Sequence, residues 1–159
     1  MKTKPITKKE FSAFSEKLAQ VFEMDIRNTK SSVSLEDIQG IEGVSFSRFK
    51  KASQVEAIPL DNMTIDSVNF YAETEKSAVF FLSKHFRNCS SHKDRIFHAD
   101  IDGKKVIVFE DIYGQNATMR AILDADKWEK TFDGIVQEYK KRIINQSKNN
   151  DKNNETKNS

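Results

Sequence analysis

All the imidazole and thiol side chains of this chain lie close together in the sequence. They fall within fourteen residues and are His85, Cys89, His92 and His98. Imidazole nitrogen and thiolate sulfur are the ligands that zinc prefers, and four of them complete a tetrahedral site. The cluster therefore predicts a zinc site, although its spacing matches no common zinc framework. The alternative is that the histidines serve the fold or face solvent. No other pattern in the chain suggests a cofactor.

The same region also contains residues suited to two kinds of catalysis. Cys89 would act as a nucleophile with a histidine as its base. A metal-dependent nuclease or hydrolase would instead use Lys105 to stabilise the leaving charge and three carboxylates as ligands, Asp100, Glu110 and Asp111. Cross-strand pairing of Asp100 with Lys105, and of Glu110 with Arg95, gives these charges a structural explanation. The five glycines form no nucleotide-binding pattern. Together these patterns favour a protein that is not an enzyme.

The positive charge of the chain is concentrated at its two ends. Residues 1–9 and 140–159 each sum to +4, and the total is +2, so residues 10–139 carry −6. Basic ends favour an acidic partner such as nucleic acid. Its contacts would come from the last helix and are Lys127, Lys130, Lys140, Lys141 and Arg142. Basic residues there are also typical of a solvated helix face, and no helix-turn-helix or aromatic RNA-binding motif accompanies them.

A β-hairpin over residues 95–111 must position most of these residues. Asp102-Gly103 joins two apolar runs and favours a two-residue turn. The resulting register places Phe97 opposite Val108 and Ala99 opposite Val106, so we expect that side of the ribbon to be buried. The other side is a mixed surface, neither core nor fully solvated, and carries Ile96, His98, Asp100, Lys105, Ile107 and Phe109.

Two amphipathic helices are expected to cover the sheet. Thr7 and Glu10 form a capping box ahead of apolar residues at helical spacing, so the first helix spans about residues 8–24. The second spans about residues 126–145, and its apolar stripe is Trp128, Phe132, Ile135, Val136, Tyr139 and Ile143. Gly134 inside that helix costs about 1 kcal/mol relative to Ala, unless another group packs closely against it.

The segments between these elements have weaker patterns. Residues 44–49, 55–60 and 63–72 predict strands, because they alternate or are rich in β-branched and aromatic side chains. Residues 75–88 fit either a strand or a helix, and their opening residues favour a helix. Residues 118–123 fit a third strand beside the hairpin or the first turns of the next helix.

These elements predict a single α+β domain over residues 8–146. Its core is an antiparallel meander around the 95–111 hairpin, covered by an N-terminal and a C-terminal amphipathic helix. Residues 1–7 are expected to be a flexible basic segment. Residues 147–159 contain no apolar side chain and are expected to be a disordered polar tail.

Composition places the chain among cytoplasmic proteins. A single cysteine excludes an internal disulfide and fits a reducing compartment. We find no secretory signal pattern and no run of about 18 apolar residues, so we expect no contact with a membrane. The expected function is that of a small accessory or regulatory protein that binds another macromolecule, with a protein as its partner. Nucleic-acid binding is the second expectation, and a metal-dependent hydrolase or nuclease is the third. The partner's identity and the oligomeric state are not specified by the sequence.

Overall fold

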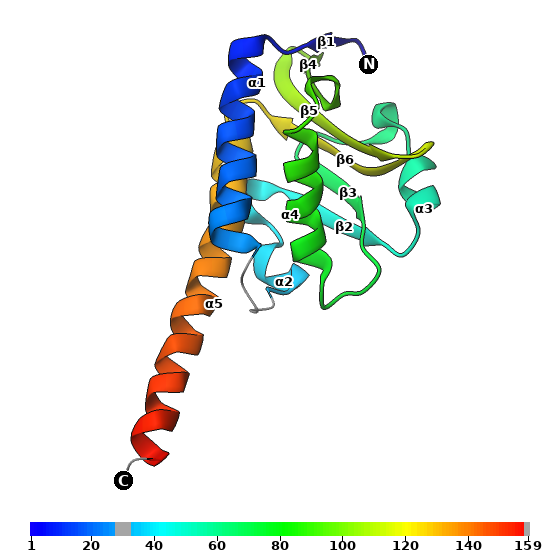
Figure 1. The fold of residues 1–159 in the computed structure, drawn as a ribbon. Helices are drawn as coiled ribbons and strands as arrows, with labels where there is room; N and C mark the ends of the chain where they lie inside the picture. The colour runs from blue at the N-terminus through cyan, green and yellow to red at the C-terminus, as the bar shows by residue number, and fades with distance from the viewer. Residues whose placement is uncertain (28–32, 158–159) are drawn as a thin grey trace.

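A mixed β-sheet organises the chain. Among residues 1–27 and 33–157, which the computed structural model describes, the strands form one six-stranded sheet of order β1-β4-β5-β6-β3-β2 (Figure 1). The strands are β1 (Thr3–Pro5), β2 (Ser45–Phe49), β3 (Ser67–Tyr71), β4 (Ile96–Ile101), β5 (Lys104–Tyr113) and β6 (Asn116–Asp124). Strands β2 and β3 are parallel, and the other neighbouring pairs are antiparallel.

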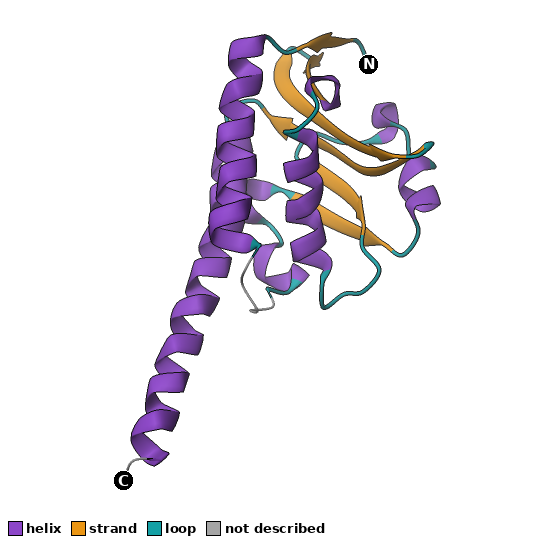
Figure 2. Cartoon of the chain, in the orientation of Figure 1, coloured by secondary structure: helices purple, strands orange, loops and turns teal. Residues whose placement is uncertain are grey.

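Three long helical segments pack against one face of this sheet (Figure 2). The first begins as α1 (Lys8–Ser15) and continues through two π-helical turns, η1 (Glu16–Gln20) and η2 (Phe22–Ile26). The other two are α4 (Ala78–Cys89) and α5 (Trp128–Lys157). The capping box of Thr7 and Glu10 is present at the start of α1, as the sequence predicts. The helix predicted over residues 75–88 is confirmed as α4.

Shorter helical pieces complete the fold. They are α2 (Leu35–Ile38), α3 (Ala52–Glu56), η3 (Ile41–Gly43), η4 (Leu60–Asn62) and η5 (Lys93–Arg95). Helix α3 and η4 form the crossover between the parallel strands β2 and β3, a connection that such a pair requires. No helix among the described residues is long and apolar enough to cross a membrane.

The predicted hairpin register is confirmed. Phe97 pairs with Val108, Ala99 with Val106, and Asp102 and Gly103 have positive φ angles of 50° and 82°. Both central residues of a type I′ turn need such angles, which asparagine, aspartate and glycine adopt most readily. Residues 118–123 form part of β6, the third strand of the meander. The α+β class is confirmed, but the sheet is mixed rather than wholly antiparallel.

The face predicted to be buried is buried at Ala99, Val106 and Val108, but the opposite face, predicted to be a mixed surface, also forms core. The main core lies on the helical side of the sheet, where Ile96, Ile107 and Phe109 are buried beneath the three helices. The face predicted to be buried forms a smaller cluster with Ala99, Val106, Val108 and Ile122. That cluster is covered by side chains of η4 and the segment after it, Leu60, Met63 and Ile65. Since the central strands are buried on both faces, alternation could not distinguish the larger core from the smaller one.

Several segments differ from expectation because distant parts of the chain contact them. Residues 55–60 contribute to α3 and η4 instead of a strand, and the strand predicted over residues 63–72 is shortened to β3. Residues 3–5 of the expected flexible N-terminus pair with β4 as an edge strand. The backbone of residues 147–157 continues α5, which projects away from the sheet, where we expected a disordered tail (Figure 1).

Candidate interaction groove

His85, the first of the predicted zinc ligands, is a buried residue that joins α4 to two strands. Its Nδ1 lies 2.8 Å from the Asp111 carboxylate and its Nε2 lies 2.8 Å from the Tyr71 carbonyl oxygen. A carboxylate and a carbonyl only accept hydrogen bonds, so both ring nitrogens face acceptors within the fold. The imidazole is therefore held by the protein on both sides rather than turned toward the other predicted zinc ligands.

The structure does not bring the other three predicted zinc ligands together with His85 at an accessible site. Cys89 is fully buried, and burial raises the pKa of its thiol well above the usual value, so the thiol keeps its proton. His92 is exposed in the loop after α4. His98 contacts the Glu10 carboxylate of α1, and the Thr7 backbone N–H together with His98 lowers the pKa of Glu10. Among the described residues, no group of three or more His, Cys, Asp or Glu is placed to hold a metal ion.

The three carboxylates of the nuclease hypothesis point to different neighbours. Asp111 contacts His85 on the helical face, while Glu110 accepts a 2.8 Å bond from Arg120 on the opposite face. Asp100 is exposed across the hairpin from Lys105, as the register predicts. The ion partner of Glu110 is therefore Arg120 rather than the predicted Arg95.

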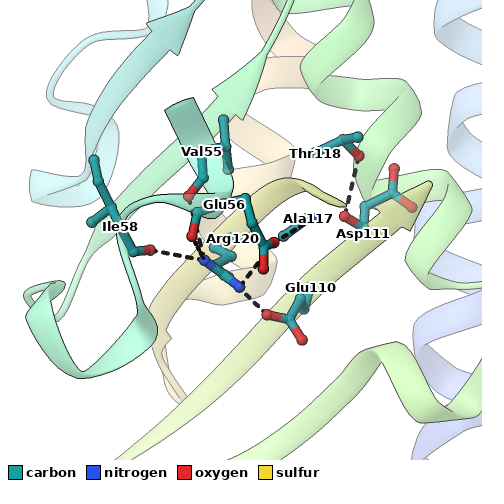
Figure 3. A network of polar contacts seen from close by, with 8 residues as sticks. All are labelled: Val55, Glu56, Ile58, Glu110, Asp111, Ala117, Thr118 and Arg120. Carbon is teal, nitrogen blue, oxygen red and sulfur yellow. Dashed lines mark hydrogen bonds and ion pairs between the residues drawn. The ribbon is translucent and has the colours of Figure 1, made fainter. Parts of the chain in front are cut away.

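Arg120 anchors the crossover to the sheet (Figure 3). Its guanidinium lies between Glu110 of β5 and the end of α3, where it donates to three backbone carbonyls, those of Val55, Glu56 and Ile58. The Glu56 carboxylate in turn accepts bonds from Arg120 and from the backbone N–H of Ala117. These contacts satisfy carbonyls that a helix end leaves open, so the network is structural.

The five basic residues proposed to contact nucleic acid do not form one continuous positive surface. Three of them are paired with acids on neighbouring elements or turns: Lys127 with Asp66, Lys141 with Glu138 and Arg142 with Asp37. Lys130 and Lys140 are exposed ten residues apart on α5. The basic N-terminal segment lies at the opposite end of the molecule from the end of α5 (Figure 1).

A groove between η2 and α4 has a different character. Its volume is about 260 Å³, and we call it the aromatic groove. It is lined by Phe22, Glu23, Arg27, Phe80, Lys84, Arg87 and Asn88. The Phe22 and Phe80 rings lie 5.7 Å apart, and the Phe80 ring contacts Phe81 edge-on at 6.0 Å. Phe80 and Phe81 are only partly buried, so the groove offers apolar surface at the exterior of the domain.

Charged side chains surround this apolar floor. Glu23 accepts from Arg27 at 2.6 Å and lies 3.6 Å from Arg87 of α4. The Lys84 ammonium lies 5.9 Å from the centre of the Phe81 ring, within the range of a cation–π contact. An aromatic centre with an arginine-rich polar rim is the composition that protein interfaces favour.

The segment that forms one wall of the groove has an unusual backbone. In η2 the Arg27 N–H donates to the Phe22 carbonyl at 2.8 Å, an i to i−5 bond that widens the helix. Such π-helical turns are rare and are frequently found at functional sites. Met24 in the same turn is 77% exposed, which is unusual for a large apolar side chain.

Two larger hollows elsewhere on the surface have no Phe, Tyr or Trp in their lining. One, of about 400 Å³, lies beside β2 and α2, and its apolar lining is limited to Leu35 and Ala78. The other, of about 350 Å³, lies beside β1, where lysines alternate with acids and the apolar lining is Pro5 and Ala99. Neither has the aromatic floor that would anchor a partner side chain.

Sequence analysis did not identify the aromatic groove, although one signal of it was present. A helix over residues 75–88 places Val79, Leu82 and Phe86 on its buried face and leaves Phe80, Phe81 and Lys84 off it. Aromatic side chains outside the buried stripe of a helix indicate a second contact surface.

Comparison with protein-family models, with curated proteins and with solved structures finds no match to this chain.

Proposed function

We propose that this protein is a small non-enzymatic accessory or regulatory protein that binds another protein through the aromatic groove. The observation that carries the proposal is the partly exposed Phe80 ring, 5.7 Å from the buried Phe22 ring, within a rim of charged side chains. Aromatic and arginine side chains at the centre of a contact supply most of the binding free energy of protein interfaces.

A non-enzymatic role is supported by the contacts and burial of four candidate catalytic groups, which are His85, Cys89, Glu110 and Asp111. His85 is held on both ring nitrogens, and the Cys89 thiol is buried and protonated. Glu110 pairs with Arg120 and Asp111 pairs with His85, on opposite faces of the sheet. These contacts and the burial of Cys89 hold the groups that general base or nucleophilic catalysis would use within the fold.

A protein partner is favoured over nucleic acid by the distribution of charge. Residues 10–139 carry −6, which opposes the approach of a long polyanion to the body of the molecule. The basic residues of α5 are partly neutralised by Asp37, Asp66 and Glu138. The aromatic groove depends instead on apolar contact, which a protein side chain supplies.

Affinity capture from the native host tests this proposal with three forms of the full chain. These are the wild type, Phe80→Ala in the groove, and Tyr113→Ala as a control that removes an exposed aromatic outside the groove. We expect a protein that the wild type and Tyr113→Ala capture equally, that Phe80→Ala loses at least tenfold, and that survives nuclease treatment. Thermal melting checks that Phe80→Ala is folded. Lys84→Ala is a second variant of the groove, at an exposed residue whose replacement should not affect folding.

Two results would overturn the proposal. Capture that disappears on nuclease treatment would transfer the function to nucleic-acid binding. Equal capture by the wild type, Phe80→Ala and Lys84→Ala would place the interaction on another surface of the molecule.

A further inference from the structure

The aromatic groove is locally positive on an acidic body. Its rim has three cations, Arg27, Lys84 and Arg87, and one anion, Glu23, whereas residues 10–139 as a whole carry −6. A concentration of one sign of charge at a groove steers partners of the opposite sign and disfavours others.

The single acid of the rim cannot satisfy the cations around it. Glu23 is divided between Arg27 at 2.6 Å and Arg87 at 3.6 Å, and Arg87 also donates to Ser91 Oγ at 3.4 Å. Each guanidinium has five N–H donors in a planar fork that matches a carboxylate. Within the described part of the chain, Lys84 has no carboxylate partner and contacts only the Phe81 ring by charge. The rim therefore retains donors for carboxylates supplied from outside.

The floor of the groove adds an apolar requirement. Phe22, which is 4% exposed, and the partly buried Phe80 form this floor. A volume of about 260 Å³ suits individual apolar side chains rather than a folded domain. The walls are two helical segments, η2 and α4, and a helix that lies between two others contacts them through residues three or four positions apart.

From this geometry we infer that the groove binds an acidic amphipathic segment of a partner protein. The inference rests on the proposed function and specifies its partner. Apolar side chains of the segment fill the space beside Phe80, and its Asp or Glu residues pair with Lys84, Arg27 and Arg87. A short acidic segment brings only a few charges to the rim, so the acidic body does not repel it as it would a long polyanion.

A display library of short random peptides, selected on the full chain, tests the sign of the partner's charge. Enriched peptides are then measured by fluorescence anisotropy against three variants. Lys84→Glu reverses a rim charge, Lys76→Glu makes the same change at an exposed site outside the groove, and Phe80→Ala removes part of the floor.

We expect enriched peptides to combine Asp or Glu with large apolar residues and to bind more weakly as salt increases. Lys84→Glu should weaken their binding about tenfold or more, and Lys76→Glu less than about threefold, since only the first charge lies on the rim.

The outcomes separate this inference from the proposed function. One outcome would be basic or uncharged peptides whose affinity falls with Phe80→Ala but not with Lys84→Glu. This result would overturn the inference of an acidic partner and would support the proposed function of the groove as a binding site. Peptides that bind all three variants equally, or a library that yields no binder, would overturn both.

Discussion

His85 illustrates how a residue type that suggests chemistry can serve the fold. It connects α4 to β3 through the Tyr71 carbonyl and to β5 through Asp111, and Asn88 of α4 adds a 3.3 Å bond to the same carboxylate. The His85 and Asp111 side chains are 10% and 11% exposed. Such a pair is costly to bury but costlier to break, because the group that remains loses its shortest hydrogen bond in a buried site.

We therefore expect strong coupling between these two residues. His85→Leu should lower the free energy of unfolding by about 3–5 kcal/mol, because Asp111 stays buried without its 2.8 Å contact to the imidazole. The double variant His85→Leu/Asp111→Leu should cost less than the sum of the two single variants, by about 0.5–3 kcal/mol. Denaturant unfolding of the four proteins gives this coupling, and additive losses would contradict the role assigned to the pair.

At the scale of elements, Gly134 explains how α5 meets the loop before β2. A Cβ atom at this position would lie 2.7 Å from Ile41 Cγ2, which is closer than real Cβ contacts come. Ile41 belongs to η3 and packs against the core. The glycine therefore allows a close approach that any larger residue would block.

This contact reverses the usual effect of replacing a helical glycine. Gly134→Ala should lower the melting temperature, although alanine is favoured by about 1 kcal/mol inside an unconstrained helix. In an Ile41→Ala background, where the clashing methyl is absent, Gly134→Ala should be neutral or stabilising. A similar loss in both backgrounds would show that the close contact is not the cause.

The attachment of α2 to α5 depends on the charge of Asp37. Its carboxylate accepts a bond from the Ser34 backbone N–H and lies 2.6 Å from Arg142 Nη2. These two contacts, the first being the larger, lower the pKa of Asp37 below its usual range. A lowered pKa means that the charged carboxylate contributes stability at neutral pH.

We predict the pH dependence that follows from this shift. The wild type should be more stable than Asp37→Asn above about pH 4, where unfolded aspartate is ionised. The difference should shrink as the pH falls through the lowered pKa of the folded protein, because the carboxylate is then protonated. Thermal melting over a pH series measures it, with the exposed Asp94→Asn as a control. A difference that persists unchanged at low pH would exclude the charge as its source.

At the scale of the whole molecule, the core and the projecting end of α5 contribute differently. Apolar side chains of α5 up to Tyr139 are buried against the sheet and the first helix. Residues 147–159 contain no apolar residue that would stabilise the fold by burial.

Removal of residues 147–159 should therefore leave the domain intact. We expect the free energy of unfolding to change by less than about 0.5 kcal/mol, the range typical of surface changes. Capture of a protein partner should also persist, because the aromatic groove lies between η2 and α4. A marked loss of stability would show that the end of α5 packs on the domain.

The sequence by itself determined the local elements. The Asp102-Gly103 turn determined the hairpin register, because strands joined by a two-residue turn can pair in only one register. The capping box at Thr7 and the apolar stripes fixed the covering helices, because helical periodicity depends only on neighbours a few residues away.

Only the tertiary structure decided how these elements contact one another. The carbonyls at the end of α3 are satisfied by Arg120, which lies more than sixty residues further along the chain, so the propensity of residues 55–60 for a strand was overridden. The Asp111 carboxylate contacts His85 because α4 packs against β5. The aromatic groove forms because η2 and α4 pack side by side and bring Phe22 to Phe80. Such contacts join residues that are distant in sequence, and no local periodicity records them.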